Sequence, residues 1–154
     1  MIQIRKGFFE TNSSSTHSIT LGDVDKMSIC TLLRPNIDGV VMIDGGYEFG
    51  WEQDIYRDSM AKSSYVWIII RDWSEPTDIF SPDSKSKEER LKMFENVIKN
   101  QTGCREIIYF DDSGYIDHQS VEGDECGWLF ESEEVLRNFI FNKNSILETD
   151  NDNH

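Results

Sequence analysis

The chain has 154 residues, of which 38% are hydrophobic and 12% aromatic, so it contains enough apolar material for one folded domain and too much for a disordered chain. It carries 29 Asp and Glu residues against 15 Lys and Arg, a formal net charge of -14. Phosphate backbones and anionic lipid surfaces repel such a chain, so we expect no direct nucleic-acid binding and no membrane binding. The charge favours instead a partner protein with a basic surface.

Targeting segments and covalent cross-links are not expected. No run approaches the roughly 18 consecutive apolar residues of a membrane span, and the N-terminus lacks the apolar region of a signal peptide. The three cysteines, Cys30, Cys104 and Cys126, are odd in number and far apart, with no CxxC pair. The sequence therefore predicts a cytoplasmic protein with free thiols and without a structural zinc site.

The first half of the chain predicts four strands and one helix. Alternation of apolar and polar residues indicates two strands, over 2–10 and 18–21, joined by the polar run 10–18. A short buried strand follows at 40–43, before a Gly-Gly turn. Residues 51–62 have the spacing of an amphipathic helix, and the near-continuous apolar run 65–70 predicts a central strand covered on both faces.

The second half predicts two helices around a hairpin. Ser86 starts the clearest helix, because Glu89 three residues later completes a capping box, and Gly103 ends it. The strands 107–110 and 115–117 are predicted to form a β-hairpin about a turn at 111–114. A last helix is expected over 132–142.

These elements are interspersed without strict alternation, which predicts an α+β fold. We expect a mixed or antiparallel sheet packed with two or three helices. Residues 1–147 are predicted to be a single domain, followed by a polar C-terminal tail, 148–154, that frays.

The segment RKGFFETNSSSTHS, from Arg5 to Ser18, resembles the N-terminal signature of a group of uncharacterised proteins encoded by bacteriophages and in phage-like regions of bacterial genomes. Three later segments resemble the same group: residues 48–51, 115–120 and 144–153. The resemblance implies a phage-type origin. It brings with it no activity and no catalytic residues.

The polar run is a candidate ligand-binding segment. Its hydroxyls donate and accept hydrogen bonds, and successive amides in a turn can form an anion-binding nest. The candidate residues are Thr11, Asn12, Ser13, Ser14, Ser15, Thr16 and His17. The run lacks the Gly and Lys of known phosphate loops, and a loop held by bonds of Ser, Thr and Asn to its own backbone is the alternative.

Candidate catalytic residues are polar groups able to act as nucleophile or base. A serine nucleophile needs a general base, and His118 beside Asp117 could supply one, although no nucleophile-elbow pattern is present. Neighbouring residues in an extended segment face opposite sides, so His17 does not serve Ser18 or Thr16. Metal-ligand spacing such as HxxxH is absent, so no metal or cofactor is expected. The candidates are Ser14, Ser15, His17, Glu48, Asp117 and His118.

Exposed aromatic residues among acidic ones suit a protein-binding surface, where Trp is frequent. Trp73 and Trp128, with Asp124 and Glu125, are the candidates. A nucleic-acid groove would need accompanying basic side chains, and these are scattered along the chain.

Two functions remain open, and with them the question of whether the chain is an enzyme. The first is an acidic phage-type protein that binds a host protein and inhibits or modulates it, such as a nucleic-acid-processing or defence enzyme (of the anti-CRISPR or anti-restriction kind). The second is a ligand-binding protein or small enzyme that acts on a nucleotide or phosphate-containing substrate through the run 10–18 with Glu48, Asp117 and His118. Convergence of these residues in one pocket would favour the second function.

Overall fold

The computed structural model describes residues 5–7, 15–50, 52–73, 85–117 and 126–151. They form an α+β fold with three α-helices and three small sheets, so the expected fold class is confirmed. Two short 3-10 turns, η1 (Val24–Lys26) and η2 (Gly127–Phe130), lie in the connections.

The largest sheet is antiparallel, with the strand order β1 (Arg5–Gly7), β2 (Ser15–Thr20), β8 (Ile146–Asn151) and β5 (Asp54–Tyr56). Two N-terminal strands are present and pair with each other, as expected, but β2 begins at Ser15, so residues 15–18 of the polar run are strand and not a connection. The expected fraying after residue 147 is wrong up to residue 151, because β8 lies between β2 and β5. Buried and less buried side chains alternate along this segment, as in any half-buried strand. Leu147 and Thr149 are the buried ones, and the polar Thr149 hides the strand pattern in the sequence.

Residues 65–70 do not form a strand but lie inside helix α1 (Ser59–Trp73). The helix expected over 51–62 is also wrong in its first part, where β5 runs, since α1 begins only at Ser59. The error has a physical cause. Every residue from Ala61 to Ile70 except Trp67 is buried, and a helix buried on nearly all sides has no polar face to reveal its period.

Helices α2 (Lys87–Thr102) and α3 (Glu133–Phe141) confirm the two helices expected in the second half of the chain. Ser86 accepts from the Glu89 amide while the Glu89 carboxylate accepts from the Ser86 amide, the capping box that the sequence indicates. Gly103 ends α2 in the left-handed conformation, with φ 70°.

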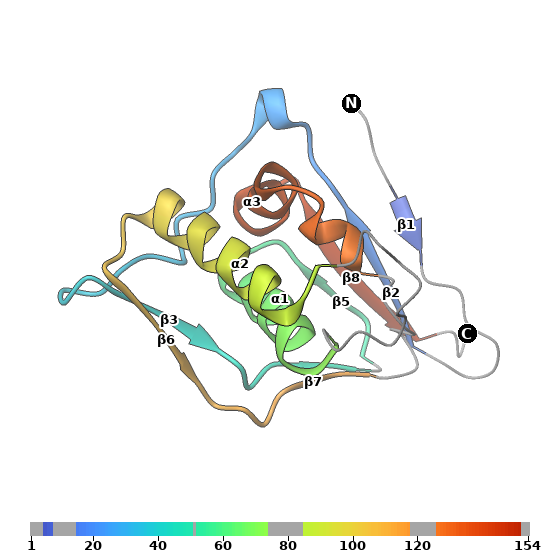
Figure 1. The fold of residues 1–154 in the computed structure, drawn as a ribbon. Helices are drawn as coiled ribbons and strands as arrows, with labels where there is room; N and C mark the ends of the chain where they lie inside the picture. The colour runs from blue at the N-terminus through green and yellow to red at the C-terminus, as the bar shows by residue number, and fades with distance from the viewer. Residues whose placement is uncertain (1–4, 8–14, 51, 74–84, 118–125, 152–154) are drawn as a thin grey trace.

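The two remaining sheets are parallel strand pairs: β3 (Val40–Asp44) with β6 (Glu106–Phe110), and β4 (Glu48–Phe49) with β7 (Tyr115–Ile116). Because β4 follows β3 and β7 follows β6, the pairs make one continuous structure, which we call the parallel ribbon (Figure 1). The expected hairpin of 107–110 and 115–117 is therefore wrong. Those segments follow one another along the same side of the ribbon.

A one-residue bulge interrupts the ribbon. Val40 pairs with Glu106, whereas Glu48 pairs with Tyr115, so the β6–β7 side holds one extra residue. Asp111, in the bulge, has a φ of 56°. Ile107 and Tyr109 face inward, and the extra residue lets Ile116 face inward too; without it, successive side chains would alternate and Tyr115 would be buried instead.

Helices α1 and α2 lie between the antiparallel sheet and the parallel ribbon, with α3 beside them (Figure 1). The inner face of the ribbon packs on these helices, and the ring of Trp67 in α1 stacks on Tyr109 at 4.1 Å between centroids. Tyr65 of α1 also contacts the ribbon, since its ring meets Phe49 of β4 edge-on at 4.9 Å. The opposite face of the ribbon is not covered by any described helix.

Candidate functional site

His17, the most specific candidate of the sequence, is a core residue. It lies in β2, paired with Thr149 of β8, and its side chain is fully buried. Its Nδ1 atom lies 3.3 Å from the hydroxyl oxygen of Tyr65. Burial lowers the pKa of His17 to about 4, because desolvation outweighs the opposing effects of the Gly50 backbone and the Asp117 charge. The imidazole is therefore neutral at pH 7.

Among the described candidates outside β2, Asp117 alone lies near His17. Asp117 follows β7, is 5% exposed, and lies close enough for its charge to act on the imidazole. Glu48 is exposed, on the face of the ribbon opposite to its buried neighbour Phe49. Ser15 and Thr16 lie in β2, paired with Asn151 and Asp150. The other candidates, Thr11, Asn12, Ser13, Ser14 and His118, lie outside the described residues.

The His17 cluster is thus a polar network inside the core. Burial raises the pKa of Tyr65 well above its usual value, and the Tyr65 hydroxyl is linked to Cys126 as well as to His17. The Tyr65 hydroxyl lies between the imidazole and the thiol, whereas Nε2 of His17 is buried with no hydrogen-bond partner among the described residues. This arrangement stabilises the contact between β2 and α1, and its imidazole is not exposed to a substrate in solution.

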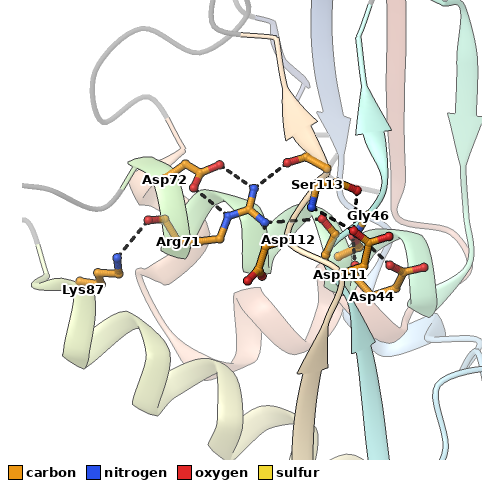
Figure 2. Close-up of polar contacts among 11 residues, drawn as sticks. Asp44, Gly46, Arg71, Asp72, Lys87, Asp111, Asp112 and Ser113 are labelled. Atoms are coloured by element: carbon orange, nitrogen blue, oxygen red, sulfur yellow. Dashed lines mark hydrogen bonds and ion pairs between the residues drawn. The ribbon is translucent and has the colours of Figure 1, made fainter.

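A second cluster of polar groups holds the bulge of the ribbon (Figure 2). The Nη2 atom of Arg71, on α1, donates to the Gly114 carbonyl at 2.6 Å, and Nη1 lies 3.8 Å from Asp112. Asp72 fixes the guanidinium with two hydrogen bonds of 2.7 Å each, and these contacts raise the pKa of Arg71. The Arg71 guanidinium is occupied in fixing the loops, whereas the Asp112 side chain is 79% exposed, so we assign Arg71 a structural role.

Close backbone contact explains the glycines of the bulge. A Cβ atom on Gly114 would stand 2.3 Å from the carbonyl oxygens of Gly45 and Tyr47. The Gly114 amide donates to Gly45 and the Tyr115 amide to Tyr47, at 2.8 and 3.0 Å. The two sides of the ribbon approach so closely here that only a residue without a side chain fits.

The outer face of the ribbon carries the strongest signal for binding. Four large side chains are exposed on it: Met42 (40%), Ile108 (39%), Phe110 (41%) and Tyr115 (45%). Met42 and Ile108 are register partners on β3 and β6, and Phe110 follows two residues further along the same face. A contiguous apolar surface of this kind marks an interaction site more often than single exposed residues do.

Carboxylates surround this outer face. Glu106 lies at one end of β6, and Asp111 and Asp112 follow the other end. Asp44 is the register partner of Phe110, and Glu48 that of Tyr115. The face therefore combines an apolar centre with an acidic border, on a chain whose net charge is already -14.

Of the sequence-predicted partner residues, the structure describes Trp73 and Trp128, and neither belongs to the strands of the ribbon. Trp128, in η2, is half-buried, and Trp73 is the last residue of α1. Asp124 and Glu125 lie outside the described residues. Among the described residues, no three His, Cys, Asp or Glu side chains are placed to hold a metal ion.

Sequence reasoning missed the outer face, although a signal was present. The run Ile107-Ile108-Tyr109-Phe110 has no polar member, so one face of an edge strand built from it must expose apolar side chains. The predicted hairpin hid this, because it placed the strand against 115–117 rather than at the margin of a parallel pair.

Comparison of the chain with family models, with curated proteins and with solved structures finds no significant match. Within the described residues, no helix is both long and apolar enough to span a membrane.

Proposed function

We propose that this chain is an interaction protein that binds a partner protein with a basic surface through the outer face of the parallel ribbon. The observation that carries the proposal is the exposed group of Met42, Ile108 and Phe110, bordered by carboxylates. Two-stranded parallel pairs are normally covered on both faces, and this one is covered on its inner face only. A partner surface would complete the cover.

The charge supplies the second part of the recognition. An acidic border steers a basic surface toward the ribbon and raises the association rate at low ionic strength. The apolar centre then contributes contact area that salt does not screen. A surface that normally holds nucleic acid is basic, so an acidic protein bound there would compete with the phosphates.

The resemblance to phage-encoded proteins suggests which kind of cell the partner belongs to. The partner would be a host protein in the bacterial cytoplasm, such as a nucleic-acid-processing or defence enzyme, and occupation of its basic surface would inhibit or modulate it. Modest size and high acidity suit this role, because the bound chain needs only to block a surface.

Capture from a bacterial lysate tests the proposal with a matched pair of variants. Ile108→Lys places a positive charge on the outer face, and Ile55→Lys places the same charge on an isoleucine that is 50% exposed on β5. We expect the wild type and Ile55→Lys to retain the same host protein at low ionic strength and release it at about 1 M salt. Ile108→Lys should fail to retain it. Retention of nothing, or equal retention by both variants, would contradict the proposal.

The alternative function retains one supporting observation, the proximity of His17 and Asp117. It would be a ligand-binding protein or small enzyme for a nucleotide or phosphate-containing compound. A thermal-shift screen with nucleotides and divalent cations tests it, because a ligand at about 100 times its Kd stabilises the native state by roughly 2.7 kcal/mol. The absence of any shift would remove its support.

A further inference from the structure

The edge of β6 is open. In the parallel pair, Gly45 donates to the Phe110 carbonyl and Glu106 donates to Gly39, at 2.8 and 3.4 Å. Together with the register, these bonds direct the backbone groups of Glu106, Ile108 and Phe110 toward β3. The N–H and C=O groups of the alternate residues, Ile107 and Tyr109, therefore point away from β3, where no described strand pairs with them.

The opposite edge of the pair, on β3, is closed at both ends. Asn36 bonds both backbone groups of Val40: its amide donates to the Val40 carbonyl at 2.8 Å, and its side-chain oxygen accepts from the Val40 amide at 3.0 Å. At the other end, the Ser64 hydroxyl donates to the Asp44 carbonyl. The two edges thus differ: within the described part of the chain, only the β6 edge has two successive outward-directed residues, Ile107 and Tyr109, with no strand paired to them. Figure 1 shows β6 along the outline of the molecule, with no labelled strand beyond it.

Strand β6 also lacks the features that usually protect an edge. Its sequence, EIIYF, has high β propensity, one charged residue, no Lys and no Pro. Strands with these properties are templates for another extended chain. The adjacent bulge at Asp111 ends the edge but does not cover it.

We propose that the partner binds by adding an extended strand to the open edge of β6, and that one face of this strand carries basic side chains at both ends of a short apolar centre. The inference rests on the proposed function and specifies its binding mode. Edge hydrogen bonds to Ile107 and Tyr109 would supply the backbone contacts. Side chains on the outer face of the added strand would lie beside Glu106, Ile108 and Phe110.

Charge decides the chemistry of the occupant. Glu106 and Phe110 are about 13 Å apart along the strand, with Asp111 and Asp112 directly beyond, so basic side chains at both ends of a short apolar centre would meet carboxylates. A second copy of this chain would place Glu106 and the bulge carboxylates against their equivalents or against another chain with a net charge of -14. The border therefore favours a basic strand over self-association.

A defined peptide tests the binding mode directly. The probe is Arg-Thr-Val-Thr-Val-Thr-Arg with blocked ends, which reads the same in both directions. Two versions carry N-methyl groups, one on the Val amides and the other on the Thr amides. An added strand directs only alternate amides to β6, so one methylated version should bind at least about tenfold more weakly while the other binds nearly as well as the parent.

Amide hydrogen exchange by NMR gives the second readout. In the free protein, we expect the Ile107 and Tyr109 amides to exchange quickly and those of Ile108 and Phe110, already bonded to β3, to exchange slowly. The parent peptide should slow Ile107 and Tyr109 by about tenfold or more and leave the other two unchanged. Ile108→Lys should weaken peptide binding about tenfold, whereas Ile55→Lys should not.

Three other outcomes would contradict the addition of a basic strand to β6. Equal binding by all three peptides, with no new protection at Ile107 and Tyr109, would mean association through charge or the outer face alone, and the proposed function would stand without this mode. No peptide binding at millimolar concentration would reject the basic strand as occupant. Dimerisation of the free chain at low ionic strength, with protection at Ile107 and Tyr109, would make a second copy the occupant. Failure of the proposed function itself would appear separately, in the lysate capture.

Discussion

Replacement of His17 by Gln should remove a large part of the loss of stability on acidification. His17 is fully buried beside Tyr65, and burial lowers its pKa to about 4 from the ordinary 6.5. The unfolded chain therefore binds a proton at this residue more readily than the folded chain does. The stabilising contribution is fully present above pH 6.5 and is lost as the pH falls from 6.5 toward 4.

The size of the effect follows from the two pKa values. The whole difference corresponds to about 3 kcal/mol, and about 2 kcal/mol of it appears between pH 7 and pH 5. Most carboxylates remain ionised over this range, so the histidine effect can be separated from acid denaturation. Loss of about 2 kcal/mol is a large fraction of the total stability of an ordinary domain.

Urea unfolding followed by tryptophan fluorescence at pH 7, 6 and 5 measures this loss. The wild type should lose about 2 kcal/mol more than His17→Gln over the interval. Thr149→Val is the matched control, because Thr149 is the register partner of His17, and its loss removes a hydrogen bond to the Glu52 carbonyl but leaves the imidazole in place. It should keep the wild-type pH dependence even if it is less stable. Equal losses in the wild type and His17→Gln would refute the reasoning.

Two further substitutions test the packing. Gly114→Ala would place a Cβ atom 2.3 Å from the carbonyls of Gly45 and Tyr47, so we expect a loss of about 1–3 kcal/mol in urea unfolding and faster amide exchange at the bulge. Lys62→Met would remove a fully buried ammonium that donates to two carbonyls just after α3, at 2.7 and 2.9 Å; two buried acceptors would lose their partner, and the midpoint of thermal unfolding should fall by an amount equivalent to about 2–4 kcal/mol.

Local chemistry made some elements predictable. The start of α2 depends on Ser86 and Glu89, which are three residues apart and form the capping box without help from distant residues. Gly103 likewise ends the helix through its own backbone freedom. The α+β class followed from the mixture of such elements, and the structure confirms it.

Elements determined by distant contacts were not predictable in the same way. The run from Tyr65 to Ile70 has the β-branched composition of a strand. It is surrounded by α2, α3, the antiparallel sheet and the parallel ribbon, and a segment buried on all sides can be a helix equally well. Lys62 in the core is a second example. Its charge argues for the surface, and only the carbonyls that follow α3 explain its burial.

The candidate site shows the same division. Composition identified His17 and Asp117 as unusual polar residues, and they do lie together, but no local pattern indicates that they are sealed in the core. The open edge of β6 depends on topology: β3 and β6 are more than 60 residues apart in sequence, and their parallel pairing decides which backbone groups remain free. A single sequence carries no direct record of that pairing.

An open, apolar edge strand must be kept from pairing with a second copy, and the net charge of -14 is the feature available to do so. Salt should weaken this protection, because the Debye length falls from about 10 Å at 0.1 M to about 3 Å at 1 M. We therefore expect the chain to sediment as a monomer at pH 7 in 0.05 M salt and to self-associate at about 1 M salt. Ile108→Lys on β6 should reduce the association, and Ile55→Lys, with the same added charge on β5, should not. Association that responds equally to both variants would place the contact elsewhere on the surface.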